Sequence, residues 1–323
     1  MRFGIISTAD IGVNAVIPAI RDSDHEAAAI GSRSGERARQ VADQFGIPRA
    51  YGDYESLLDD DGIDAVYNPL PNALHAEWTR AAADRGLDVL CEKPLTPDAA
   101  GARDLFDYCE NRDVTLMEAF MYRFHPRTER AATIVGNQLG DVRSVSATFK
   151  FPLEDPADVR LDPDLAGGSL LDVGCYAVSA ARLFLGEPVR VRGSTTDTRD
   201  SGVDTEMAAI LEYDDGAIAR VASGFDTRPV ERYRVDATDG WLTAERAFAP
   251  EADEGVSLRY AVDDRRVTET FDPVDHYRLE VERFADSAAA GSTPRIDRAE
   301  TVANTRVLDA IALSADRDAP VAV

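Results

Sequence analysis

Lysine is nearly absent from this chain of 323 residues. Of its 35 basic residues only two, Lys93 and Lys150, are lysine. A guanidinium stays charged at any working pH, so arginine cannot replace a compact ammonium that has to release or relay a proton. A lysine kept in an arginine background is therefore a candidate for chemistry, with chance placement as the alternative. Lys93, which lies in the run Cys91-Glu92-Lys93-Pro94, is the stronger candidate.

Cysteine and histidine are also scarce. The three cysteines are odd in number and widely spaced, without a CxxC pair, which argues against a disulfide framework and a zinc site. The four histidines lack the spacing of metal ligands. We therefore predict no metal, and we interpret Cys91 and Cys175 as small buried residues.

We find no long apolar run in the sequence. No run approaches the ~18 residues that a membrane span requires. No charged region followed by an apolar core and a cleavage site begins the chain. We expect a soluble, cytoplasmic protein.

Positive charge is in short supply as well. There are 59 acidic residues against 35 basic ones, a formal net charge of -24. This excess argues against nucleic acid and anionic membranes as partners. Together with the scarcity of lysine, it favours a protein adapted to a very salty cytoplasm over an ordinary acidic protein.

Short β-rich runs alternate with helical patterns up to about residue 123. This alternation predicts βαβ units around a parallel sheet. The predicted strands are 2–6, 27–32, 64–67, 88–92 and 114–117, and the predicted helices are 11–20, 34–45, 53–59, 73–85 and 98–112.

The pattern changes after residue 124. Asp214-Asp215-Gly216 between two β runs is a strong hairpin signal. We predict an α+β domain on a mostly antiparallel sheet. Its predicted strands are 142–151, 206–213, 217–225, 231–237, 241–245 and 256–261, and its predicted helices are 126–138, 275–290 and 297–314.

The turn after the first predicted strand is a candidate nucleotide site. Dinucleotide folds need small residues there so that the backbone approaches the pyrophosphate. The usual G-x-G-x-x-G spacing is replaced by Ser7-x-Ala9-x-x-Gly12, which an ordinary βα turn explains equally well. The candidate cofactor-binding residues of this turn are Ser7, Thr8, Ala9, Asp10 and Ile11.

The end of the second predicted strand indicates which dinucleotide binds. An enzyme that uses NAD places Asp or Glu there to accept from the ribose 2′-hydroxyl. This chain has Ser32 and Arg33 instead, a hydroxyl and a guanidinium that suit the 2′-phosphate of NADP. A solvated loop arginine is the alternative.

Four blocks of sequence, in order along the chain, carry a family resemblance. They are residues 68–75, 92–94, 117–126 and 167–176. With them the chain resembles the glucose-fructose oxidoreductase, inositol dehydrogenase and rhizopine catabolism family over nearly its whole length. Tyr176, where many members carry histidine, makes it similar to NADP-dependent D-xylose dehydrogenases and dimeric dihydrodiol dehydrogenases.

The resemblance implies a fold and an assembly. It predicts an NADP-binding Rossmann domain, residues 1–123, and a substrate-binding and oligomerisation domain, residues 124–323, with a large, mostly antiparallel open sheet. Residues after about 296 are expected to pack back on the first domain. The open sheet is expected to form a homodimer or homotetramer.

The resemblance also implies site residues for hydride transfer between the anomeric carbon of a sugar and NADP. Tyr176 and Lys93 form the predicted proton-transfer pair, because a nearby ammonium favours the phenolate. Asp172, four residues before Tyr176 on the same helix face, orients Lys93 or holds a sugar hydroxyl, unless it is only a stabilising charge at a helix start. Leu70, Asn72, His75, Glu92 and Lys93 are further cofactor-binding candidates, and Tyr122, Arg123, Asp172 and Tyr176 are substrate-binding candidates. A cis Lys93–Pro94 bond is implied too.

Two alternatives stay open. The first keeps the fold and acts on a dihydrodiol or an anhydro-sugar ketone. The second is a non-catalytic dinucleotide sensor that regulates a partner protein. The presence of Lys93, Asp172 and Tyr176 together argues against the sensor, because such a protein is expected to lose its proton-transfer residues.

Overall fold

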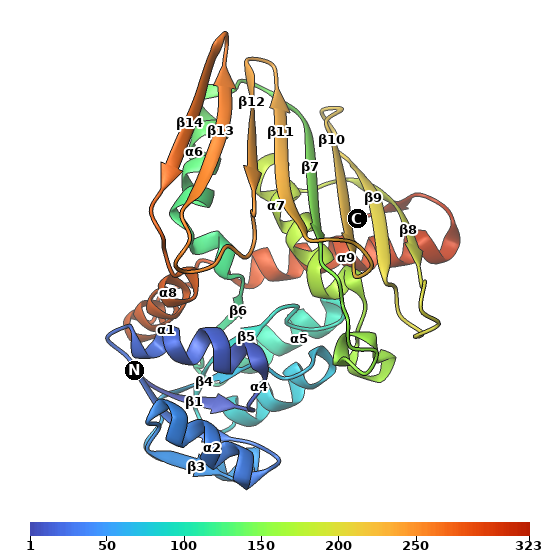
Figure 1. Cartoon of the computed structure of the whole chain (residues 1–323). Helices are drawn as coiled ribbons and strands as arrows, with labels where there is room; N and C mark the ends of the chain where they lie inside the picture. The colour runs from blue at the N-terminus through green and yellow to red at the C-terminus, as the bar shows by residue number, and fades with distance from the viewer. The chain divides into compact units, whose positions relative to one another are not determined.

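The computed structural model describes all residues from Met1 to Val323, and the chain divides into two compact units. The first unit comprises Met1–Met121 and Asp275–Val302, and the second comprises Tyr122–Val274 and Ala303–Val323. Figure 1 labels most of the helices and strands of both units. We predicted an NADP-binding domain up to residue 123 and a substrate-binding and oligomerisation domain from residue 124. These separate functions stay a prediction.

A six-stranded sheet forms the centre of the first unit. All its strands are parallel, in the order β3-β2-β1-β4-β5-β6. They are β1 (Arg2–Ile6), β2 (Glu26–Gly31), β3 (Arg49–Tyr51), β4 (Ala65–Asn68), β5 (Asp88–Glu92) and β6 (Leu116–Ala119). The order reverses between β1 and β4, and ligands of open α/β sheets bind beyond the carboxyl ends of the strands at such a reversal. The predicted parallel sheet is confirmed, whereas the short strand β3 was not predicted.

Helices cover both faces of this sheet. They are η1 (Gly12–Val16), α1 (Ile17–Arg21), α2 (Gly35–Phe45), α3 (Tyr54–Leu58), η2 (Asn72–Leu74), α4 (His75–Ala83), α5 (Ala99–Glu110), α8 (His276–Ala290) and the first turn of α9 (Arg298–Arg317). Apolar side chains of α3, α4 and α5 share one buried core with Val66 and Val89 of the sheet. On another side α8 packs against α1, and Phe284 of α8 lies 6.0 Å from the ring of Phe3 in β1.

N-cap residues explain where several helices of this unit begin. Ser34, Asp53 and Asp98 have extended backbones, and their side chains accept the backbone N–H three residues later. Such caps satisfy donors that the first helical turn leaves without a partner. They set the starts of α2, α3 and α5.

A nine-stranded sheet forms the second unit, with the strand order β14-β13-β12-β11-β7-β10-β9-β8-β15. The central pair β7 and β10 is parallel, and every other neighbouring pair is antiparallel. The strands are β7 (Val142–Lys150), β8 (Arg190–Thr196), β9 (Glu206–Glu212), β10 (Ile218–Gly224), β11 (Val230–Ala237), β12 (Gly240–Glu245), β13 (Val256–Val262), β14 (Arg265–Phe271) and β15 (Val321–Ala322). The predicted open, mostly antiparallel sheet and its β9–β10 hairpin are confirmed.

One face of this sheet is covered by helices. α6 (Pro126–Gln138) packs on β12 and β13, and α7 (Cys175–Leu185) packs on β7, β10 and β11. Ser314, in the later part of α9, accepts the backbone N–H of Gly193 in β8 at 3.0 Å. The other face carries outward side chains such as Ile210 and Ile218, which are 43% and 45% exposed.

The helical stretch Pro163–Leu185 is long and apolar enough to qualify as a membrane span by length and composition, with a mean hydropathy of 1.3 over its best window. Asp172 and Arg182 interrupt this stretch, so it is not the uninterrupted apolar run that the sequence was expected to lack. Because 78% of that window is buried inside the protein, packing in the core of the second unit accounts for its apolar character.

Candidate active site

The turn after β1, where we predict the pyrophosphate to bind, is tight although it lacks the usual glycines. Ser7 has a φ of 86°, a left-handed conformation that normally favours glycine. Its side chain stabilises this turn, because Oγ accepts the N–H of Ala9 at 3.1 Å. The N–H of Ser7 donates to the carbonyl oxygen of Gly31 in β2 at 2.9 Å. The small residues of this turn therefore lie beside the end of β2.

The end of β2 presents cations and hydroxyls. Ser32 is buried, whereas Arg33 and Arg37 are exposed, and neither arginine forms an ion pair. Ser34 accepts the backbone N–H of Arg37, which places Arg37 in the first turn of α2. Two guanidiniums without carboxylate partners fit a 2′-phosphate. Arg37 was not predicted from the sequence, although its spacing of four residues from Arg33 was a usable signal.

The loop after β4 is held by buried polar side chains. Asn68 donates from Nδ2 to the carbonyl oxygen of His75 at 3.2 Å and accepts the N–H of Leu70 at 3.3 Å. Nε2 of His75 lies 2.6 Å from the carbonyl oxygen of Leu70, and its Nδ1 lies 2.9 Å from that of Pro94. Burial lowers the pKa of His75 to about 4. His75 thus joins two loops at the carboxyl ends of β4 and β5, and its predicted part in cofactor binding stays a prediction.

The turn around Lys93 is held by two glutamates. Glu92 accepts the hydroxyl of Tyr67 at 2.7 Å and the N–H of Lys93 at 3.3 Å. The Lys93–Pro94 bond is cis, as the resemblance implied. Glu118, in β6, accepts the N–H of Leu95 at 2.8 Å, and burial raises its pKa to about 7. Glu118 was not singled out from the sequence, although it lies inside the block 117–126.

The other lysine has a structural partner. Lys150 in β7 forms an ion pair with Glu206 in β9, and β10 lies between these two strands. Gly224 lies between them in the register of the sheet, and a Cβ there would meet the Glu206 carboxylate. Because this pairing explains the second lysine, Lys93 is left as the candidate for chemistry.

In the second unit, Asp204 holds the glycine-rich segment before η6 (Leu170–Gly174). Its Oδ2 accepts the hydroxyl of Ser169 at 2.7 Å and the N–H of Leu170 at 2.8 Å. Gly168 has a φ of 110°, and a Cβ there would lie 2.4 Å from Oδ1 of Asp204. Burial raises the pKa of Asp204 to about 6. Asp204 thereby sets the direction in which η6 leaves this loop.

Asp172 and Tyr176 follow on η6 and α7. Oδ2 of Asp172 accepts from Nε of Arg160 at 2.9 Å. Tyr176 is buried, with its ring 5.3 Å from Phe149 and 5.7 Å from Phe248. Arg160 was not predicted from the sequence, because it lies outside every block of the resemblance.

The two other predicted substrate residues adjoin α7. The buried hydroxyl of Tyr122 lies 2.7 Å from Oγ of Ser179, and its ring lies 5.8 Å from that of Tyr176. Arg123 donates from Nη1 to the same Oγ at 3.4 Å. The structure therefore brings Tyr122, Arg123, Asp172 and Tyr176 together in the second unit, while Lys93 and the nucleotide candidates belong to the first.

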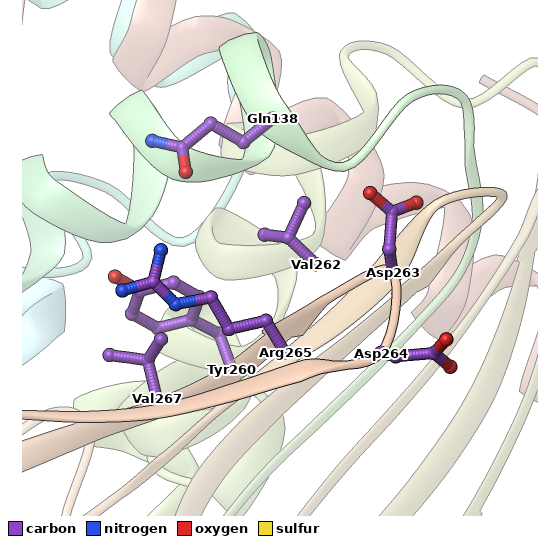
Figure 2. A pocket seen from close by; sticks show the side chains of 7 residues that line it. All are labelled: Gln138, Tyr260, Val262, Asp263, Asp264, Arg265 and Val267. Carbon is purple, nitrogen blue, oxygen red and sulfur yellow. The ribbon is translucent and has the colours of Figure 1, made fainter.

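Other features lie apart from these residues. All three cysteines are buried and unbridged, which confirms the interpretation of Cys91 and Cys175 as small buried residues. No group of three or more His, Cys, Asp and Glu side chains is arranged to hold a metal ion. An open cavity of ≈ 840 Å³ lies at the C-terminal end of α6 and the β13–β14 hairpin (Figure 2). It is lined by Gln138, Tyr260, Val262, Asp263, Asp264, Arg265 and Val267, none of which is a predicted site residue.

Comparison with known proteins assigns a family to each part of the chain. The family described as "Oxidoreductase family, NAD-binding Rossmann fold" (GFO/IDH/MocA) matches residues 1–120, and the "GFO/IDH/MocA C-terminal domain" matches residues 130–243.

Three relatives span different degrees of similarity. A D-xylose 1-dehydrogenase (NADP(+)) from Haloferax volcanii is 62% identical, over 99% of each chain. A 3-ketoreductase from Actinomadura kijaniata, solved with NADP and TDP-benzene, is 32% identical over 97% of each chain, with a TM-score of 0.92. A trans-1,2-dihydrobenzene-1,2-diol dehydrogenase from Xenopus laevis is 36% identical, over 66% of this chain and 65% of its own.

Proposed function

This chain belongs to the GFO/IDH/MocA oxidoreductase family, and from that membership we propose that it is an NADP-dependent sugar dehydrogenase. The substrate is an aldose such as D-xylose or D-glucose, oxidised at C1 to the lactone. The observation that carries this proposal is the 62% identity to an NADP-dependent D-xylose 1-dehydrogenase across 99% of both chains.

The same comparison separates the leading function from the dihydrodiol alternative. The dihydrodiol dehydrogenase is 36% identical over 66% of this chain, a lower identity over a shorter part. A 3-ketoreductase with the same fold bound TDP-benzene, so the fold by itself does not select the sugar. The sensor alternative is disfavoured because Lys93, Asp172 and Tyr176 are all present, whereas the Rossmann fold by itself does not exclude it.

NADP is held, in this proposal, at the carboxyl edge of the parallel sheet. The Ser7–Ile11 turn faces the pyrophosphate, and Ser32, Arg33 and Arg37 bind the 2′-phosphate. Leu70, Asn72, His75 and Glu92 shape the edge that receives the nicotinamide ribose. Bound NADP+ supplies the hydride acceptor for the oxidation.

Proton transfer is assigned to the side chains of Tyr176 and Lys93. Oη of Tyr176 takes the proton of the sugar hydroxyl, which a free phenol with a pKa of ~10 does poorly at neutral pH. The ammonium of Lys93 favours the phenolate and so lowers that pKa. Asp172 orients Lys93 or holds a sugar hydroxyl, and Tyr122 and Arg123 line the substrate side.

We also place the protein as a homo-oligomer in a salty cytoplasm, without nucleic acid or membrane partners. The outward side chains of Ile210 and Ile218, on the neighbouring strands β9 and β10, support an interface on the open face of the nine-stranded sheet. The net charge of -24 and a Haloferax relative support the salty environment.

A substrate panel tests the proposed function. Aldoses, polyols and trans-dihydrodiols are offered with NADP+ in high salt, and NADPH absorbance is followed. Oxidation of an aldose to a lactone is the expected result. Turnover of diols alone would favour the alternative, and binding of NADP without turnover of any substrate would favour the sensor. Light scattering that shows only a 35.1 kDa monomer would refute the oligomer.

A further inference from the structure

We propose that Arg160 is a specificity-determining residue of this site, which donates from Nη2 to an oxygen of an uncharged sugar. In the same proposal the two carboxylates of Asp158 and Asp172 outweigh its single positive charge, so that phosphorylated sugars are rejected. This inference rests on the proposed function, because it names the class of sugar that the dehydrogenase accepts.

Two nitrogen atoms of the Arg160 guanidinium donate hydrogen bonds within the protein, and the third does not. Nε donates to Oδ2 of Asp172 at 2.9 Å, and Nη1 donates to both carboxylate oxygens of Asp158 at 3.2 and 3.3 Å. Nη2 makes no hydrogen bond or ion pair within the protein, and the side chain is 42% exposed. An arginine carries five N–H donors in a fixed fork. The two N–H groups of Nη2 are therefore free to reach an acceptor from outside.

Arg160 is also held in place through its backbone. Asp158 accepts the N–H of Arg160 at 2.9 Å and caps the short helix η4 (Val159–Leu161). The carbonyl oxygen of Arg160 accepts the N–H of Gly168 at 2.9 Å. A Cβ on Gly167 would lie 2.4 Å from that oxygen, so glycine at 167 permits this close approach. A donor fixed in this way loses little conformational freedom when it binds a ligand.

The position of Arg160 connects it with the proposed chemistry. Its partner Asp172 precedes Tyr176 by one helical turn. Its guanidinium also lies 5.9 Å from the ring of Phe151. The ring of Phe151 lies 6.4 Å from that of Phe149, which packs against Tyr176. A sugar bound beside Asp172 on the exposed side of this cluster therefore meets the donors of Nη2.

Charge decides which sugar is accepted. The two carboxylates hold the pKa of Arg160 further above its ordinary value, Asp172 having the larger effect, so Arg160 stays a cation. One guanidinium between two carboxylates gives the trio a net charge of -1. A phosphate monoester carries about -1.5 to -2 at neutral pH, and it would meet this negative trio. A hydroxyl or ring oxygen accepts from Nη2 without that repulsion.

The test compares Arg160→Gln and Arg160→Lys with the wild type on whichever aldose the wild type turns over. Losing a hydrogen bond to a charged donor should raise the KM for the sugar by about 10- to 100-fold. The KM for NADP+ should stay within about twofold, because Arg160 belongs to the second unit. A KM for the sugar that stays unchanged in both variants, with only kcat reduced, would overturn the proposal and leave Arg160 as a residue that orients Asp172.

Arg130→Gln is the matched control, because this arginine of α6 is paired with Glu269 and contacts no predicted site residue. It should keep wild-type kinetics. Thermal melting of each variant checks the fold, and Arg160→Lys keeps the proposal testable if Arg160→Gln does not fold.

Asp158→Asn tests the charge argument separately. The ratio of kcat/KM for D-xylose 5-phosphate to kcat/KM for D-xylose should rise by about tenfold, because one of the two negative charges is removed. An unchanged ratio would overturn the role given to the carboxylates.

Sugar binding to the protein–NADPH complex, followed by the fluorescence of NADPH, separates the two proposals. A wild type that oxidises no aldose contradicts the proposed function. Arg160→Gln that binds sugar as tightly as the wild type contradicts the role of Arg160, whatever the activity of the wild type.

Discussion

Glu118 in β6 accepts the backbone N–H of Leu95 at 2.8 Å, two residues after Lys93. Its other oxygen, Oε2, is buried and has no hydrogen-bond partner. Burial accordingly raises the pKa of Glu118 to about 7, and the charge of Lys93 opposes part of that shift. The turn that carries Lys93 is thus held by a carboxyl group that keeps its proton at mildly acidic pH.

Replacing Glu118 by Gln should change how stability depends on pH. The unfolded chain releases the Glu118 proton near pH 4.5, whereas the folded protein keeps it up to about pH 7. The contribution of this group to the free energy of unfolding therefore falls as the pH rises from 4.5 to 7. The glutamine of the variant does not titrate. The free energy of unfolding of the variant should therefore increase relative to that of the wild type across this window, by about 3 kcal/mol at the upper end. Denaturant unfolding between pH 4.5 and 8 measures this. Glu77→Gln, at an exposed position of α4, is the control, and a difference that does not vary with pH would contradict the prediction.

Replacing His125 should change the pH dependence of stability in the opposite direction, with the effect growing as the pH falls. Its Nδ1 accepts the N–H of Arg127 at the start of α6, at 3.0 Å. Burial, aided by the charge of Arg127, lowers the pKa of His125 to about 4. The unfolded chain takes up a proton near pH 6.5, so the stability contributed by neutral His125 is present above 6.5 and is lost as the pH falls toward 4. His125→Asn keeps a capping oxygen but does not titrate, and it should gain on the wild type by about 3 kcal/mol as the pH falls through this window.

Chemical denaturation at pH 7 and pH 4.5 measures the effect of His125→Asn. His125→Ala is the companion variant, because it removes both the titration and the cap, and it should lose about 1 kcal/mol at pH 7. The same stability difference between His125→Asn and the wild type at both pH values would be the contrary result.

Cofactor choice should depend on the arginines at the end of β2. Arg33→Asp removes a phosphate partner and adds repulsion, so it should reverse or abolish the preference for NADP over NAD. Arg37→Gln should weaken NADP binding and leave NAD binding unchanged, since NAD lacks the 2′-phosphate. Steady-state kinetics with both dinucleotides measures the preference. A wild type that prefers NAD would show that this strand end has been misinterpreted.

Lys93 and Tyr176 should behave as one proton-transfer unit. Lys93→Arg keeps a charge but removes the compact donor, so kcat should collapse while NADP still binds. Tyr176→Phe should lower kcat by ~10²–10⁴, the range expected for acid–base groups. The double variant should be little worse than either single variant, because deletions within one unit do not add. Most of the wild-type kcat surviving in Lys93→Arg would leave the lysine without a chemical role.

Salt should stabilise the folded protein. The net charge of -24 repels itself at low ionic strength, and 1 M salt shortens the Debye length to ~3 Å. The melting temperature should therefore rise steeply from low salt to saturated KCl. A flat profile would show that self-repulsion is not what limits stability.

Local sequence patterns predicted many of the strands and turns of the fold. Strand β1 and strand β5 have the predicted bounds, because a buried parallel strand is a short apolar run that ends at polar residues. The β9–β10 hairpin follows from Asp214-Asp215-Gly216, since its turn requires a residue such as Gly216, with a φ of 83°. The turn after β1 was also found from a short motif, whereas the cis bond before Pro94 was implied by the family resemblance.

Strands without such a pattern were missed. β8 and β14 carry mostly arginine, threonine and serine, with one buried residue in β8 and none in β14. They form strands because a neighbouring strand supplies hydrogen-bond partners for their backbone. An alternation of apolar and polar residues within the segment does not reveal such a partner. The three half-buried residues of β3 were missed for the same reason.

The sequence by itself determined which residue types are available for chemistry: Lys93 in an arginine-rich chain, Ser32 and Arg33 at the end of a strand, and Asp172 one turn before Tyr176. Only the tertiary structure decided which of them have partners. Arg160 meets Asp172 across a loop, Asp204 meets Ser169 across 35 positions, and Glu118 supports the Lys93 turn from the next strand. Contacts of this kind depend on where distant backbone segments pass one another, and that is set by the packing of the whole unit and not by the spacing of residues along the chain.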